Sequence, residues 1–215
     1  MADRAKRLQS AVLLFALILL IFLITSIALS FLPQDLSDLE GRAAEGEEVV
    51  PSRNIQRVLE NAGQQDLVVT LTEKELNYYL SSQLSGQQDG LLKDQVSYQG
   101  TWVRLREGII ELIIEREAFN RPHTIAMNVE IEQLIEEGDK MNTKIDWRGG
   151  RLGQLPVPQG YLLLVMPGYE ELARVLKPEV RALRTLLEGK SVIEISEGKV
   201  TFTPRSTGSD SLPVF

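Results

Sequence analysis

The hydrophobic positions divide the chain into one continuous apolar stretch and a longer region of alternating and helical patterns. Residues 11–32, AVLLFALILLIFLITSIALSFL, contain no charged residue. A helix of this length rises roughly 33 Å, which is enough to cross a bilayer core about 30 Å thick. The pattern therefore predicts a transmembrane helix over residues 11–32.

The charges on the two sides of this stretch differ in sign. Residues 1–10 are basic, whereas residues 33–51 are acidic. Basic residues stay on the cytoplasmic side of a membrane. We therefore expect a cytoplasmic N-terminus, a single-pass anchor in the cell membrane, and a C-terminal domain outside the cytoplasm, in the periplasm or the extracellular space. A cleaved signal peptide is the alternative, because Ala28-Leu29-Ser30 is a passable cleavage site.

The rest of the chain divides by texture into three parts. Residues 33–51 are polar and have no periodicity, so we expect an acidic linker there. Residues 52–205 carry periodic patterns and are long enough for one extracytoplasmic α+β domain. Residues 206–215 are expected to form a disordered tail.

The stretch TLTEKELNYYL predicts a strand that turns into a helix. Thr72 is a typical N-cap residue, and Glu75, three residues later, completes a capping box. Leu76 and Leu80 lie one turn apart on an apolar stripe. Asn77 is needed neither for the cap nor for the stripe.

Alternating polar and apolar positions over residues 102–148 predict an antiparallel meander with one dry and one wet face. On its second strand Ile110, Leu112 and Ile114 share the dry face, and the glutamates of that strand lie on the wet face. We expect those glutamates to be solvated rather than to act as a glycosidase acid pair. The last strand places Met141, Thr143, Ile145 and Trp147 together on one face. The predicted turns are Glu107-Gly108, Asn120-Arg121-Pro122 and Glu137-Gly138-Asp139.

The pattern changes after the meander. A glycine- and proline-rich crossing over residues 149–158 leads into residues 161–166, which are apolar on all sides and are expected to be enclosed by the sheet. An amphipathic helix over residues 172–187 should break or kink at Pro178. A hairpin over residues 192–202, turned at Glu197-Gly198, closes the domain.

Composition limits the chemistry. The net charge of −7 argues against binding to nucleic acid. The absence of cysteine excludes disulfides, thiolate metal sites and cysteine nucleophiles. His123 is the single histidine, and neither a Ser-x-x-Lys nor a Gly-x-Ser-x-Gly motif is present. We therefore predict a protein that is not an enzyme and that uses no cofactor and no metal.

Two short motifs carry a family resemblance: LT-x-x-x-LN-x-x-L, from Leu71 to Leu80, and G-x-L-P-x-P, from Gly153 to Pro158. With the order of elements around them, residues 65–204 resemble the YpmS-like membrane-anchored bacterial proteins. More distantly, they resemble LmeA-type and tubular lipid-binding (TULIP-like) domains. The resemblance implies a curved antiparallel sheet wrapped around a long helix, with an apolar groove for acyl chains. It also implies that Asn77 bonds to neighbouring backbone rather than to a ligand. The motif positions are Thr72, Glu75, Leu76, Asn77, Leu80, Gly153, Pro156 and Pro158.

Two functional hypotheses follow. The first is a membrane-tethered, non-catalytic domain that binds lipid or another apolar ligand between sheet and helix. Its candidate lining residues, for each of which plain core packing is the alternative, are Ile110, Leu112, Ile114, Tyr161, Leu164, Val165 and Met166. The second is an interaction or scaffold subunit of a cell-envelope assembly, with a solid core and with Tyr78, Tyr79 and Trp102 as contact residues. The expected partners are the lipid bilayer through residues 11–32, a lipid ligand and an envelope protein, with no nucleic acid.

Overall fold

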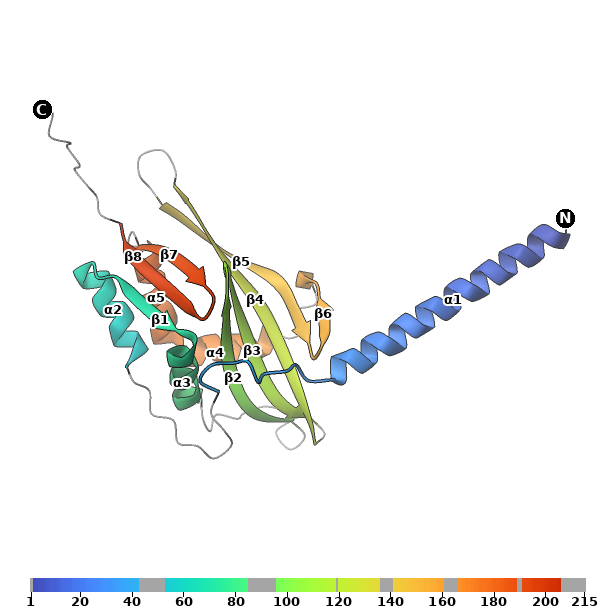
Figure 1. Cartoon of the computed structure of the whole chain (residues 1–215), viewed down its shortest axis with the longest axis horizontal. Helices are drawn as coiled ribbons and strands as arrows, with labels where there is room; N and C mark the ends of the chain where they lie inside the picture. The colour runs from blue at the N-terminus through green and yellow to red at the C-terminus, as the bar shows by residue number, and fades with distance from the viewer. Residues whose placement is uncertain are drawn as a thin grey trace, which may run out of the picture.

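A computed structural model describes residues 2–42, 53–84, 96–118, 120–135, 141–160, 166–188 and 191–205. The fold is α+β, as predicted, and its strands form two antiparallel sheets (Figure 1). The elements are α1 (Ala2–Phe31), α2 (Ile55–Gln65), β1 (Val69–Thr72), α3 (Glu73–Leu84), β2 (Val96–Arg106), β3 (Ile109–Ala118), β4 (Arg121–Ile135), β5 (Met141–Leu152), β6 (Leu155–Val157), α4 (Met166–Val175), α5 (Lys177–Glu188), β7 (Ser191–Ser196) and β8 (Lys199–Pro204). The predicted tail and the predicted turn at Glu137-Gly138-Asp139 lie outside the described residues.

Helix α1 extends away from the rest of the protein (Figure 1). Its stretch from Gln9 to Phe31 is long and apolar enough to cross a membrane, and no part of the most apolar window is buried inside the protein. Such a helix would expose a large apolar surface to water, which soluble proteins rarely do. Length and composition therefore agree with the predicted anchor.

The larger sheet is the predicted meander. Its strand order is β2-β3-β4-β5-β6, and each strand is antiparallel to the next. The smaller sheet has the order β1-β8-β7, so the first strand of the domain pairs with the last. The C-terminal hairpin has the predicted two-residue turn, in which Ser196 pairs with Lys199.

The tips of two hairpins join the sheets. Gly108, in the β2–β3 turn, donates its N–H to the carbonyl of Ile195 at 3.0 Å. Gly198, in the β7–β8 turn, donates its N–H to the carbonyl of Leu105 at 3.1 Å. Both glycines have a positive φ, 72° and 70°, which a residue with a Cβ adopts at a cost. The two short turns thus fix the smaller sheet against one end of the larger.

The main core fills the space between the larger sheet, the smaller sheet and helices α2 to α5. We call the face of the larger sheet that contributes to it the inner face, and the opposite face the outer face. The buried members of this core are Ile55, Leu59, Ala62, Val69, Leu71, Tyr79, Leu80, Val103, Leu105, Ile114, Ile125, Met127, Tyr169, Leu172, Ala182, Leu186, Leu187, Ile195, Val200 and Phe202.

Two short helices stand where the resemblance implied one long helix. Helix α4 ends at Val175 and α5 begins at Lys177. The break therefore lies at Leu176, two residues before its predicted position at Pro178. Pro178 lies in the first turn of α5, where a missing N–H costs no hydrogen bond. A sheet wrapped around a single long helix is therefore not confirmed. Instead, α4 reaches the inner face through Tyr169, whose hydroxyl lies 3.2 Å from the carbonyls of Leu112 and Ile125.

The predicted capping box at the start of α3 is confirmed. The backbone N–H of Glu75 donates to Oγ1 of Thr72 at 3.2 Å, and the backbone N–H of Thr72 donates to Oε2 of Glu75 at 3.0 Å. The pKa of Glu75 is lowered because the bonds from Thr72 and Arg53 outweigh the opposing effect of burial, which is the largest single contribution.

We expect Thr72→Ala to lower the free energy of unfolding by about 0.5–2 kcal/mol, because an alanine cannot accept the N–H of Glu75. Chemical denaturation followed by tryptophan fluorescence would measure the change. Thr185→Ala is the matched control, since Thr185 is exposed within α5, where alanine is the preferred residue. Equal midpoints for Thr72→Ala and the unmutated protein would show that the cap adds no stability.

Candidate functional site

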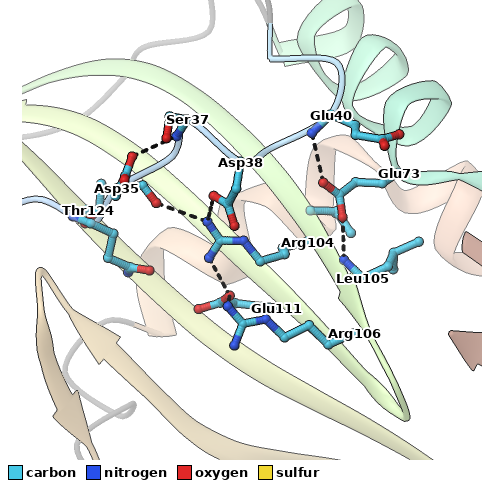
Figure 2. A network of polar contacts seen from close by, with 12 residues as sticks. Asp35, Ser37, Asp38, Glu40, Glu73, Arg104, Leu105, Arg106, Glu111 and Thr124 are labelled. Atoms are coloured by element: carbon cyan, nitrogen blue, oxygen red, sulfur yellow. Dashed lines mark hydrogen bonds and ion pairs between the residues drawn. The ribbon is translucent and has the colours of Figure 1, made fainter. Parts of the chain in front are cut away.

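The segment after α1 is not a free linker in its first part. We call residues 33–42 the strap. They run over the outer face of the larger sheet (Figure 2). Leu36 and Leu39 are buried there in one cluster with Trp102, Ile113 and Ala126. The sequence predicted a solvated linker because two leucines three residues apart are too few to reveal a periodic pattern. The later part of the predicted linker lies outside the described residues.

A buried arginine holds the strap to the sheet. Arg104, on β2, donates to Glu111 on β3 at 2.8 Å and to Asp38 of the strap at 2.6 Å. It also donates to the backbone carbonyl of Asp35 at 3.1 Å. Figure 2 shows the guanidinium between the two acids. Burial alone would lower the pKa of Arg104, but its bonds to Glu111 and Asp38 raise the pKa above the ordinary value, so the group stays charged.

Glu73 joins three parts of the protein at the start of α3. Its carboxylate accepts the N–H of Leu105 on β2 at 2.8 Å and the N–H of Glu40 in the strap at 3.0 Å (Figure 2). Its own backbone N–H donates to the carbonyl of Gly198 in the smaller sheet at 2.8 Å. From its sequence position alone, Glu73 is an acid in the first turn of a helix, where the helix dipole favours negative charge. Its partners are far away along the chain, so no local pattern could indicate them.

Asn77, one turn later on α3, completes this arrangement. Its side chain is fully buried, accepts the N–H of Val103 at 2.7 Å and donates to the carbonyl of Val103 at 3.0 Å. It also donates to the carbonyl of Glu40 at 2.7 Å. The backbone bonds implied for Asn77 are therefore present. Because β2 is the edge strand of the larger sheet, Asn77 and Glu73 occupy backbone groups that would otherwise stay unpaired.

The end of α1 is fixed to the same sheet. The carbonyl of Leu29 accepts the N–H of Gln154 at 3.0 Å, and the N–H of Gly153 donates to the carbonyl of Thr124 at 2.7 Å. A Cβ on Gly153 would lie 2.4 Å from the carbonyl oxygen of Leu32, so only glycine fits. The β5–β6 turn thereby caps one of the carbonyls that the last turn of a helix leaves without partners, that of Leu29. This contact explains Gly153 of the G-x-L-P-x-P motif, whereas Pro156 lies on the short edge strand β6.

Two predictions about the outer face are wrong. Glu111 is buried rather than solvated, because the strap covers it and Arg104 pairs with it. Trp102, expected as an exposed contact residue, is buried beneath the strap and donates its ring N–H to Glu115 at 3.0 Å. Tyr79, another expected contact residue, belongs to the main core. Tyr78 is half-buried, with Nζ of Lys74 5.5 Å from the centre of its ring.

Burial on the inner face decreases from one edge of the sheet to the other. Cross-strand pairing places Leu105, Ile110, Val129 and Trp147 in one row across β2, β3, β4 and β5. Leu105 is 1% exposed, the next two residues are half-buried, and Trp147 is 39% exposed. In the neighbouring row Ile131 pairs with Ile145, which is 47% exposed. The dry face predicted for β5 is therefore open to solvent at these two residues.

The predicted lining residues fall into two groups. Ile114 is fully buried in the main core, while Ile110 and Leu112 are half-buried against it. For Tyr161, Leu164 and Val165 the structure describes no position, and Met166 begins α4 without a described side chain. The open apolar surface lies beside Ile110, at Val129, Ile131, Ile145 and Trp147. We call these four residues the open patch.

A cleft lies between α2 and α5 and encloses about 580 Å³. Its floor includes Leu59, Ala182 and Leu186, which belong to the main core. Charged residues of both signs, among them Glu60 and Arg181, line its sides. Within the described ranges, no group of three acidic or histidine side chains is placed to hold a metal ion.

His123 lies on β4, directly opposite Arg116 on β3. It is half-buried. Burial lowers its pKa, the charge of Arg116 lowers it further, and a hydrogen bond with the backbone of Ser30 in α1 opposes the change. This histidine therefore lies at the end of the sheet that adjoins α1.

Asn77→Asp tests the bonds that join α3, β2 and the strap. An ionised carboxylate still accepts the N–H of Val103, but the carbonyls of Val103 and Glu40 lose their donor, at about 1–3 kcal/mol for the buried one. The variant should therefore be less stable by several kcal/mol at pH 7. Burial beside carbonyls should raise the folded pKa of the new aspartate above its unfolded value of about 3.9. The folded protein is then more stable with this aspartate protonated than with it ionised. This gain in unfolding free energy is fully present below pH 3.9 and is lost as the pH rises through the folded pKa.

The difference in unfolding free energy between Asn77→Asp and the unmutated protein should thus shrink as the pH is lowered toward 4. Denaturation at a series of pH values measures it. Asn61→Asp, at an exposed position of α2, is the matched control and should show only a small difference at every pH. A small, pH-independent effect of Asn77→Asp would contradict the bonding described here.

No protein-family model matches this chain, and no curated protein sequence matches it significantly. The resemblance to the YpmS-like proteins therefore stays a prediction that rests on the two motifs and the order of the elements.

Proposed function

We propose that this protein is a membrane-anchored, non-catalytic, extracytoplasmic domain that holds an apolar ligand, such as an acyl chain, on the inner face of its larger sheet. The observation that carries the proposal is the open patch. It continues the apolar surface of the main core without a break, yet Ile145 and Trp147 are 47% and 39% exposed. Binding sites for small ligands are mostly apolar surfaces with few polar groups.

The ligand position follows from the cross-strand rows. An acyl chain lying along β4 and β5 would contact Val129, Ile131, Ile145 and Trp147 and would extend the core at the place where burial decreases. Gln133, next along β4, accepts the N–H of Ile193 at 2.8 Å and donates to the carbonyl of Ser191 at 3.0 Å. These bonds hold the smaller sheet beside the open patch. The resemblance to lipid-binding families supports a ligand of this kind.

A second candidate is an interaction subunit of an envelope assembly. The cleft between α2 and α5 favours it, since a groove between two helices with an apolar floor and sides of mixed charge suits a protein segment better than an acyl chain. The two candidates use different surfaces, so one set of variants can separate them.

We expect the C-terminal domain to lie outside the cytoplasm. A C-terminal alkaline phosphatase fusion should be active in a bacterial host, because the basic residues precede α1 and the acidic strap follows it. A fusion of a cytoplasmic fluorescent protein to the C-terminus is the control and should stay dark. An inactive phosphatase fusion together with a fluorescent control would reverse the orientation.

We expect the affinity for an apolar ligand to depend on the exposed side chains of the open patch. The double variant Ile145→Ser, Trp147→Ser should bind a fluorescent fatty acid at least roughly tenfold more weakly, because a ligand would cover about half of each apolar side chain. The suitable protein is residues 33–205, which lacks the span that would take up the probe but keeps the strap. The free energy of unfolding should change little, since both side chains are partly exposed without ligand.

Leu134→Ser is the matched control for that experiment. Leu134 is on β4 and is 58% exposed, but it lies on the outer face. Its loss should leave the affinity unchanged. If the unmutated domain shows no saturable binding, or if Leu134→Ser weakens binding equally, the open patch is not a ligand site and the interaction subunit is the remaining candidate.

A further inference from the structure

The end of the larger sheet next to α1 carries a row of basic side chains. Arg116 pairs with His123 across β3 and β4, and Arg121 lies two residues before His123 on β4. Side chains two residues apart on a strand share a face, so all three lie on the inner face. Arg116 and His123 are half-buried and Arg121 is exposed. We call Arg116, Arg121 and His123 the basic row.

The basic row lacks acidic partners among the side chains that the structure describes. Several other arginines form ion pairs with carboxylates, namely Arg42, Arg53, Arg104, Arg106 and Arg148. In contrast, no described carboxylate lies within ion-pair distance of Arg116 or Arg121. The charge of Arg116 acts on Tyr98, His123 and Tyr169. It opposes the rise in pKa that burial causes at the two tyrosines and adds to the lowering of the pKa that burial causes at His123. In a chain with a net charge of −7, this local excess of positive charge needs an explanation.

The position of the basic row relative to α1 supplies one. The backbone of Ser30, in the last turn of α1, bonds with His123. The next residue, Thr124, accepts the N–H of Gln34 on its hydroxyl at 2.9 Å and accepts the N–H of Gly153 on its carbonyl. The last turn of α1 is therefore fixed directly beside the basic row. If α1 spans a bilayer, this row lies at the level where lipid headgroups begin.

We propose that the basic row binds the phosphate groups of anionic phospholipids in the leaflet that adjoins the domain. The inference rests on the membrane span of the proposed function, but not on the open patch, which lies at the other end of the inner face. Arg121 meets the headgroup from the exposed side, and Arg116 provides a second, less hydrated cation. Each basic group near a lipid surface strengthens attraction to anionic lipid about fivefold.

The experiment is native mass spectrometry of the full-length chain in detergent, titrated with phosphatidylglycerol or with phosphatidylcholine. The unmutated protein should bind phosphatidylglycerol more tightly. The double variant Arg116→Gln, Arg121→Gln should bind phosphatidylglycerol about twenty-five-fold more weakly. Its binding of phosphatidylcholine should be unchanged. Arg57→Gln removes the same charge from an exposed position on α2, away from α1 (Figure 1), and should change neither. The basic residues before α1 remain in every variant, so their contribution cancels.

Equal affinity for the two lipids, or unchanged phosphatidylglycerol affinity in the double variant, would overturn the proposal. Arg121→Gln alone covers the case in which the double variant does not fold. This side chain is exposed, and its loss should still cost about fivefold. Extraction of the protein from membranes by alkaline carbonate would instead show that α1 is not a span. Fatty-acid binding to the open patch, measured on the same variants, should not change.

Discussion

The structure depends on how the free edge of β2 is closed. An edge strand exposes unpaired backbone groups that invite pairing with other chains, and in this protein two side chains of α3 occupy them. Asn77 forms two bonds with Val103, as a neighbouring strand would, and Glu73 takes the N–H of Leu105. Both side chains also bond to Glu40 of the strap. One helix turn therefore protects the sheet edge and orients the segment that leads to α1.

The strap turns the outer face of the sheet into a second, smaller core. Leu36 and Leu39 bury Trp102, Ile113 and Ala126. Arg104 and Glu111 form a buried ion pair. Removing either one would leave the other as an uncompensated buried charge, a change that typically costs about 3–5 kcal/mol. The strap therefore belongs to the folded domain. A fragment that begins after it would expose both the aromatic ring and the arginine.

Local features of the chain were predictable and distant ones were not. The capping box at Thr72 and Glu75, the turns at Gly108 and Gly198, and the break before Pro178 all depend on residues within a few positions of each other. The partners of Glu73 and Arg104 lie more than thirty residues away along the chain, at Leu105 and at Asp38, so no window of sequence contains them. The open patch was not predictable either, because Ile145 alternates with polar residues just as the buried Leu105 does. Only the arrangement of the helices decides which of them is covered.

The cap on the last turn of α1 has a mechanical consequence. Gln154 bonds to the carbonyl of Leu29 in the last turn of the helix, while the neighbouring Gly153 and Gln34 both bond to Thr124 of β4. A helix in a bilayer tilts when its apolar length and the local thickness differ. With a flexible tether the domain would not respond to such a tilt. If α1 spans a bilayer as proposed, the sheet would rotate with the helix, and the membrane thickness would set the angle at which the inner face meets the lipid surface.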